Sequence, residues 1–106
     1  MNEPVTIRST DFWVKVVEML QQNWAVIEDE VAGAVRVYFI SDIGGVFDEI
    51  AFPSAISANE ALAMNGFRRF AESRDLQSFL RPPTGPFRRS NHPNGAIYSS
   101  GRFWRS

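Results

Sequence analysis

Two alternating stretches on either side of a pair of glycines constrain the fold of this chain most strongly. Between residues 35 and 52 the side chains alternate in character, many of them are β-branched or aromatic, and Gly44 and Gly45 interrupt the pattern. Period-two alternation of such residues is typical of β-strands, and glycine supplies the backbone freedom that a tight reversal needs. The pattern predicts an antiparallel hairpin that ends at Pro53. The alternating positions are Val35, Val37, Phe39, Val46, Asp48, Ile50 and Phe52, with Arg36, Tyr38, Ile40, Phe47, Glu49 and Ala51 between them.

A third strand is predicted just before this hairpin. Residues from Trp24 to Ile27 form a short apolar run, and the acidic residues 28–30 with Gly33 follow it. Polar residues and glycine between two apolar stretches have the composition of a turn. The three strands would therefore follow one another as a meander.

An amphipathic helix is predicted ahead of the meander. Apolar side chains recur there at three- and four-residue spacing, which is the period of a helix with one face in the core. Ser9 or Thr10 is suited to cap the first turn, Asp11 suits the positive end of the helix dipole, and Asn23 is a candidate C-terminal cap. The apolar positions are Phe12, Trp13, Val16, Val17, Leu20 and Trp24, and the polar ones are Lys15, Glu18, Gln21 and Gln22.

A second helix is predicted from Ser57, because Ser57 and Glu60 have the spacing of a capping box. Gly66 interrupts its apolar face, and we expect the helix to continue through this position with close packing at the glycine. Residues 74–80 predict a further helical turn or two, which the two prolines after them end.

The order of these elements, α-β-β-β-α, predicts an α+β fold. We expect a small antiparallel sheet of three strands, or four if the C-terminal tail adds one, with the two main helices on one face. The second face would then be solvated, covered by the tail or buried in a dimer. Residues 1–83 would form the compact core, and residues 84–106 an arginine- and aromatic-rich extension packed on the same domain. The side chains expected on the second face are Arg36, Tyr38, Phe47 and Glu49.

The net charge of −1 conceals a division of charge along the chain. Residues 1–60 carry three basic and ten acidic side chains, a net charge of −7, whereas residues 61–106 carry eight basic and two acidic ones, a net charge of +6. Such a division arises where the two halves attract each other in the fold, or where one half binds a partner. Both origins stay open from the sequence alone.

Composition excludes several kinds of site. The chain has no cysteine, which rules out disulfides, thiolate zinc sites and a cysteine nucleophile. His92 is the only histidine and a candidate general base, but no nucleophile motif surrounds it. The acidic residues lack the spacing of a calcium loop, and the glycine pair lacks the rest of a phosphate loop. We therefore expect no metal, no cofactor and no enzymatic activity.

The N-terminus lacks the basic and apolar regions of a signal peptide. No apolar run approaches the length that spans a bilayer. We therefore expect a cytoplasmic protein with no membrane partner.

The arginine-rich tail is the strongest candidate binding segment. It interleaves cations with aromatic rings, a mixture that pairs with the phosphates and stacks on the bases of single-stranded nucleic acids. The same residue types dominate the hot spots of protein interfaces, and they would also serve simply to close the core. The candidate residues are Phe87, Arg88, Arg89, Tyr98, Arg102, Trp104 and Arg105, a patch that Arg68 and Arg69 would extend.

The sequence favours a non-enzymatic, small bacterial-type module that binds a protein partner, regulates one, or associates with itself. A nucleic-acid-binding protein that uses the tail is the alternative, although a pI near 5.8 is acidic for such a protein. A small enzyme built around His92 is the third hypothesis.

Overall fold

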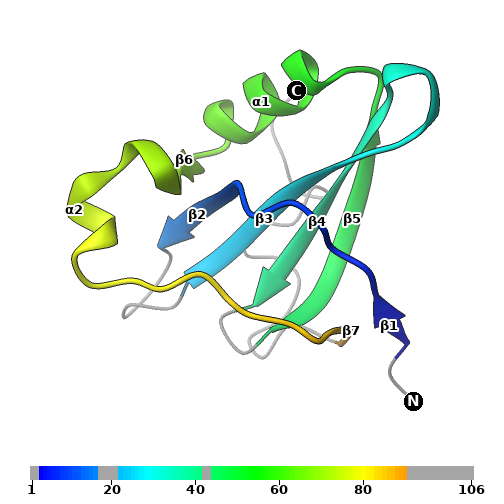
Figure 1. Cartoon of the computed structure of the whole chain (residues 1–106). Helices are drawn as coiled ribbons and strands as arrows, with labels where there is room; N and C mark the ends of the chain where they lie inside the picture. The colour runs from blue at the N-terminus through cyan, green and yellow to red at the C-terminus, as the bar shows by residue number, and fades with distance from the viewer. Residues whose placement is uncertain (1–2, 17–21, 42–43, 91–106) are drawn as a thin grey trace.

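The computed structural model describes residues 3–16, 22–41 and 44–90. Within them the chain forms one mixed sheet of seven strands, in the order β1-β7-β5-β4-β3-β2-β6, and two short α-helices (Figure 1). The strands are β1 (Pro4–Val5), β2 (Phe12–Val16), β3 (Gln22–Asp29), β4 (Val35–Ser41), β5 (Gly45–Phe52), β6 (Arg68–Arg69) and β7 (Phe87–Arg89). The helices are α1 (Ala55–Met64) and α2 (Arg74–Gln77), and the 3-10 turns are η2 (Val31–Gly33) and η3 (Phe70–Glu72).

The centre of the sheet is an antiparallel meander of β2, β3, β4 and β5. Tyr38 in β4 lies opposite Val26 in β3 and Glu49 in β5, so the predicted hairpin and the predicted third strand are both confirmed. β3 is longer than predicted because residues at both of its polar ends also pair with β4. The reversal between β3 and β4 passes through Ala32 and Gly33, which both adopt a positive φ.

The predicted helix over residues 10–23 is wrong. β2 occupies its first half and pairs antiparallel with β3, in a register that places Val14 opposite Trp24. β2 is apolar on both faces, because Phe12 and Val14 pack into one core cluster and Trp13 packs into the other. A strand buried on both sides is a continuous apolar run without alternation. The spacing of the apolar residues in this segment therefore matched the period of a helix by coincidence.

Helix α1 is capped three residues earlier than predicted. The Ser54 hydroxyl accepts a hydrogen bond from the Ser57 N–H at 3.1 Å, and the Ser57 hydroxyl accepts one from the Ser54 N–H at 3.3 Å. A capping box is therefore present, but Ser54 is its N-cap and Ser57 occupies the N3 position. The predicted continuation through Gly66 is also wrong, because a φ of 89° at this glycine ends the helix. The turn expected within residues 74–80 is confirmed as α2.

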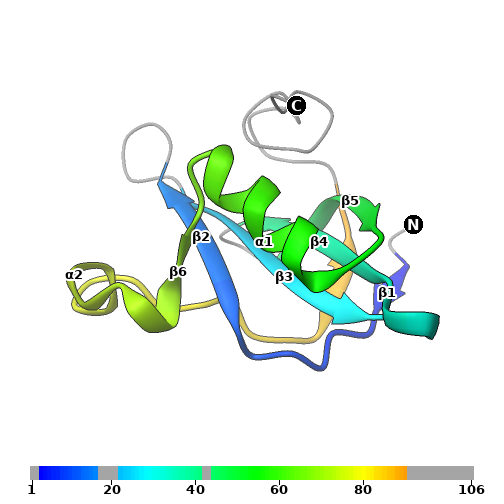
Figure 2. The same cartoon turned by 90° about the horizontal axis from the view of Figure 1, so that it is seen from above.

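The sheet is larger than predicted, and both of its faces are covered. α1 lies over one face, and the N-terminal segment and the chain between α2 and β7 lie against the other (Figure 2). The expected α+β fold, with a three- or four-stranded antiparallel sheet and both helices on one face, is therefore wrong. β1, β6 and β7 are only two or three residues long. Strands this short show no alternation by which a sequence pattern could reveal them.

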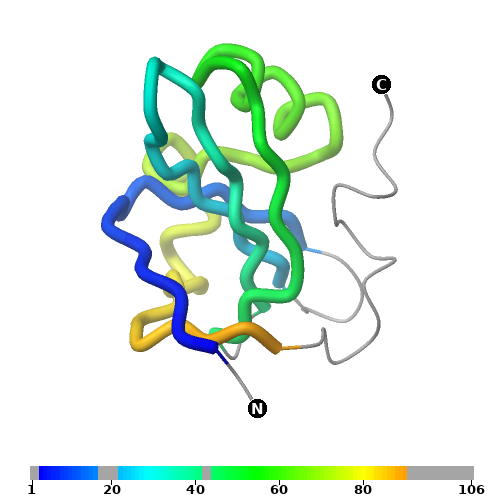
Figure 3. Tube along the Cα trace, turned by 90° about the vertical axis from the view of Figure 1, so that its right-hand side faces the viewer, coloured from blue at the N-terminus to red at the C-terminus, as the bar shows by residue number. Residues whose placement is uncertain are grey.

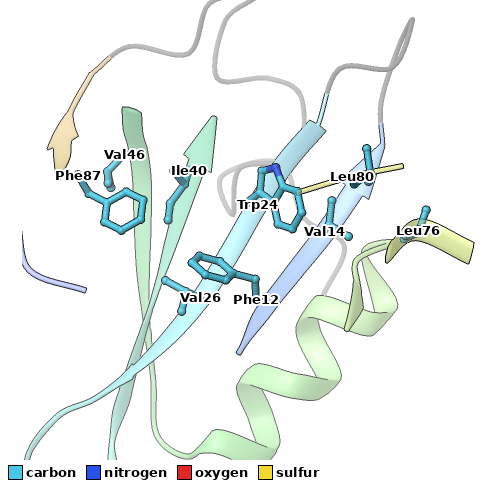
Figure 4. Close-up of a cluster of buried hydrophobic side chains, with 9 residues drawn as sticks. All are labelled: Phe12, Val14, Trp24, Val26, Ile40, Val46, Leu76, Leu80 and Phe87. Atoms are coloured by element: carbon cyan, nitrogen blue, oxygen red, sulfur yellow. The ribbon is translucent and has the colours of Figure 1, made fainter. Parts of the chain in front are cut away.

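Each face of the sheet has its own hydrophobic cluster. The cluster beneath α1 contains Trp13, Ala25, Val35, Val37, Phe39, Ala58, Leu62 and Phe67. The cluster on the other face contains Phe12, Val14, Trp24, Val26, Ile40, Val46, Leu76, Leu80 and Phe87 (Figure 4). Tyr38 packs against this second cluster, whereas Phe47 packs beneath α1. The expectation that these two side chains share a face is therefore also wrong.

β7 belongs to the predicted C-terminal extension. It pairs with β1 in the antiparallel sense and with β5 in the parallel sense, so it lies inside the sheet. Residues 91–106 lie outside the described residues, and the division of the chain at residue 83 stays a prediction.

We expect Leu62→Ala to destabilise the protein by about 2–5 kcal/mol, because Leu62 is fully buried beneath α1 and its truncation leaves a cavity. Met64→Ala in the same helix is the matched control, since Met64 keeps 61% of its surface exposed, and its cost should stay within about 0.5 kcal/mol. Urea unfolding followed by tryptophan fluorescence measures both. Equal losses in the two variants would contradict the placement of α1.

Candidate functional site at the edge of β5

Among the described residues, a neighbouring strand lies on the outer side of β5 only at its start. Its inner side pairs with β4 as far as Phe52, whereas β7 pairs with it only at Gly45 and Val46. Figure 3 shows β7, in orange, at the lower end of the green β5 segment. In the part of the chain that the structure describes, no strand pairs with β5 beyond this point. We call Glu49–Ala51, which lie beyond this pairing with β7, the β5 edge.

A bulge lies just before the β5 edge. Phe39 in β4 lies opposite Asp48, but its neighbour Ile40 lies opposite Val46, so β5 has one residue more than β4 at this point. A bulge re-aims the backbone groups of every residue that follows it. The groups that would have faced β4 then face away from it.

The backbone beyond the bulge therefore directs hydrogen-bonding groups outward at odd-numbered positions. Before the bulge, the Val46 carbonyl faces β7 and accepts a hydrogen bond from the Ser90 N–H at 3.0 Å. After it, the Glu49 N–H donates to the Asp48 side-chain Oδ1 at 2.9 Å, and this local partner indicates that the N–H points away from β4. Backbone direction alternates along a strand, so Ala51 also faces outward.

The side chains of the β5 edge alternate between the two faces of the sheet. Ile50 is half-buried and packs against the cluster beneath α1. Glu49 lies opposite Tyr38, which packs on the other face. Ala51 is exposed and small, so an approaching strand meets little steric resistance at this position.

Glu49 is the centre of a line of ion pairs on the face opposite α1. Arg36 Nη1 lies 2.8 Å from Glu49 Oε2, and Arg36 Nε lies 2.8 Å from Glu30 Oε2. Arg89 of β7 contacts the second Glu49 oxygen and lies 3.5 Å from Glu3. The Glu49 side chain keeps only 24% of its surface exposed, so solvent screens these pairs less than fully exposed ones. The network joins Glu3, the residue before β1, to β7, β5 and β4.

This environment changes the acidity of Tyr38. Burial raises the pKa of its hydroxyl above the ordinary value, and the negative charge of Glu49 raises it further. The hydrogen bond with Glu30 likewise raises the pKa of the Arg36 guanidinium, which stays charged.

The residues predicted to bind a partner occupy different positions in the fold. Phe87 is buried in the core with 8% exposure, so it holds β7 in place. Arg88 is exposed, and Arg89 is ion-paired with Glu3 and Glu49. Tyr98, Arg102, Trp104 and Arg105 lie outside the described residues, as does His92.

The two arginines that would extend the predicted patch are paired with acidic side chains. Arg68 donates to both oxygens of Asp75, at 2.9 and 3.0 Å, and this interaction lowers the pKa of the Asp75 carboxyl. Arg69 donates from Nε to both oxygens of Asp11 at 3.0 Å. Their charges are therefore used within the fold.

Sequence reasoning missed the β5 edge. The edge depends on where β7 joins the sheet, which is a contact between residues about forty positions apart. A local signal was nevertheless present. Val46 and Phe47 are adjacent apolar residues, and Asp48 and Glu49 are adjacent acids, so strict alternation fails at the position of the bulge.

Neither a metal centre nor a known family accounts for this edge. The described residues contain no group of three or more His, Cys, Asp or Glu side chains that could hold a metal ion. No helix among them is long and apolar enough to cross a membrane. Comparison of the chain with protein-family models, with curated proteins and with solved structures finds no match. The function must therefore be inferred from the geometry of the site.

We expect Tyr38 to ionise above its ordinary pKa of 10.0, and Glu49→Gln to lower this pKa because it removes a nearby negative charge. The neutral hydroxyl contributes stability that is fully present below the pKa of the unfolded chain and is lost as pH rises through the higher folded pKa. Alkaline titration of tyrosinate absorbance measures the pKa, and Tyr38→Phe identifies its share of the signal. An unchanged titration in Glu49→Gln would contradict the coupling.

Proposed function

We propose that the protein is a non-enzymatic protein-binding module whose binding site is the β5 edge, and that a second copy of the chain is the partner that fits it. The observation that carries the proposal is the outward-facing backbone of Glu49 and Ala51, beside which the described residues place no strand. A row of such groups is a template for pairing with another strand.

The arrangement of the edge selects one way for two copies to pair. In an antiparallel pair related by a two-fold axis, Ile50 lies opposite Ile50 of the second copy, and Glu49 lies opposite Ala51. This register meets two independent requirements. Residues that lie opposite each other share a face of the sheet, and the outward-facing Glu49 and Ala51 exchange both of their backbone hydrogen bonds.

The charges of the edge are compatible with this register. Glu49 faces an alanine of the second copy and not another acid, so no like charges lie directly opposite each other. Arg36 and Arg89 already neutralise Glu49 within each chain. A shift of the register that brought Glu49 opposite Glu49 would place like charges side by side.

Pairing of this kind is weak and reversible. It adds four backbone hydrogen bonds, each worth a net of about 0.5–1.5 kcal/mol, and covers the half-exposed Ile50 side chains. The Asp48 side chain must also release the Glu49 N–H before the second strand can bind it. We therefore expect an equilibrium between monomer and dimer that depends on protein concentration.

The alternative functions have less support. Arg36, Arg68, Arg69 and Arg89 are paired with carboxylates of the same chain, so a nucleic-acid phosphate would have to compete with these partners. The enzyme hypothesis rests on His92, which lies outside the described residues. The edge of β5 is therefore the site with the most complete geometry.

We expect Ala51→Pro to raise the dissociation constant of the dimer at least about tenfold, which corresponds to about 1.4 kcal/mol. Proline removes an outward N–H that the second strand needs, but no hydrogen bond to β4. Ala55→Pro is the matched control, since Ala55 is exposed and occupies the first position of α1, where proline is tolerated. Sedimentation velocity over a concentration series measures the equilibrium, and circular dichroism checks the fold.

The same experiment can reject the proposal. A wild-type chain that stays monomeric at every concentration excludes the second copy as partner. Hydrogen exchange separates the remaining occupants of the edge. Protection of the Ala51 amide that grows with protein concentration supports the dimer, whereas equal protection at all concentrations shows that residues of the same chain cover the edge.

A pair of opposite charges at Ala51 tests the register itself. Ala51→Glu places an acid opposite Glu49 of the second copy and should weaken the dimer, whereas Ala51→Lys places a base there and should not. Cross-strand charge pairs are worth about 0.2–1 kcal/mol, so the two dissociation constants should differ by a few-fold in this direction. Equal effects of both variants would contradict the register with Ile50 on the axis.

A further inference from the structure

A groove of about 420 Å³ lies between the N-terminal segment and the chain that leads into β7. One wall comes from residues 7–12 and the other from residues 82–87. Its volume falls within the range of pockets that bind small molecules. The groove involves neither Glu49 nor Ala51, so its role is independent of the β5 edge.

The walls of the groove are mainly apolar. Phe12 and Phe87 belong to the hydrophobic cluster of this face, and each keeps 8% of its surface exposed (Figure 4). Ile7 packs against the same cluster from the N-terminal segment. Pro82 and Pro83 line the opposite wall and have no N–H to satisfy. This part of the groove suits an aliphatic chain.

Arg8 adds a cationic residue to the lining of the groove. It is exposed and lines the groove together with the hydroxyl-bearing residues Ser9, Thr10 and Thr84. Within residues 3–16, 22–41 and 44–90, no carboxylate forms an ion pair with its guanidinium. Arg8 therefore differs from Arg36, whose charge is used in the network around Glu49.

The segment that carries Arg8 is held in place by its backbone. Glu28 Oε2 accepts a hydrogen bond from the Arg8 N–H at 3.1 Å and another from the Ser9 N–H at 2.7 Å. Glu28 and Asp29 line a smaller adjoining cavity of about 300 Å³ on the other side of Arg8. These acids repel anions, and the repulsion grows with the charge of the ligand, so a single negative charge is disfavoured least.

We propose that this groove binds a free aliphatic carboxylate, with its chain against Phe12, Phe87 and the two prolines and its carboxylate on the Arg8 guanidinium. Arginine matches a carboxylate with two parallel hydrogen bonds, and the apolar walls remove the chain from water. The Arg8 guanidinium thus selects the carboxylate end of the ligand, and the apolar lining selects its aliphatic end.

Decanoate is the probe, with decanol and acetate as partial ligands that carry only its chain or only its charge. Calorimetric titration of the full chain at low salt should show binding of decanoate and much weaker binding of the other two. Arg8→Gln should weaken decanoate binding about tenfold, because it removes the charge-assisted hydrogen bonds to the carboxylate. Arg74→Gln is the control, since Arg74 is exposed and lines neither cavity.

A second variant tests the groove without changing its charge. Thr84→Trp fills the space between the two walls and should abolish binding while Arg8 remains. Decanoate that fails to bind below its micelle concentration would overturn the proposal, as would equal affinities in Arg8→Gln and the wild type. Decanol that binds as tightly as decanoate would show that the groove takes a neutral apolar molecule or segment.

Discussion

The fold depends on the burial of both faces of its central strands. β2, β3 and β4 carry apolar side chains on either side, so neither face can be left to solvent. α1 covers one face through Ala58 and Leu62. No second long helix exists among the described residues to cover the other face. That face is closed by the N-terminal segment, α2 and the chain into β7, and this closure creates both the groove beside Arg8 and the short pairing of β7 with β5.

Local patterns identified the parts of the fold whose side chains alternate or whose ends carry a cap. The hairpin of β4 and β5 was predictable because its side chains alternate, and the start of α1 was nearly correct because a capping box lies there. β2 was mistaken for a helix because Trp13 and Val14 are buried on opposite faces. β1, β6 and β7 were not predictable, since strands of two or three residues exist only through the neighbours with which they pair.

The division of charge along the chain has a partial explanation in the fold. Arg69 bonds Asp11, and Arg89 pairs with Glu3 and Glu49, so basic residues of the second half do hold acidic residues of the first. Other pairs stay within one half, as Arg68 does with Asp75. The sequence could show that such attraction was available, but only the register of β7 determines which arginine of the second half reaches Glu49. The candidate site was unpredictable for the same reason.

An exposed strand edge is a hazard, because it can pair with any extended chain. β5 carries several features that limit this. The bulge at Asp48 interrupts the register, the Asp48 carboxylate binds the Glu49 N–H, and Glu49 places a charge on the strand. Such features oppose unspecific pairing, but they leave Ile50 and Ala51 open to a strand that brings a small uncharged residue opposite Glu49. The chain's own β5 has such a residue at Ala51, so the proposed pairing with a second copy would bring no like charge opposite Glu49.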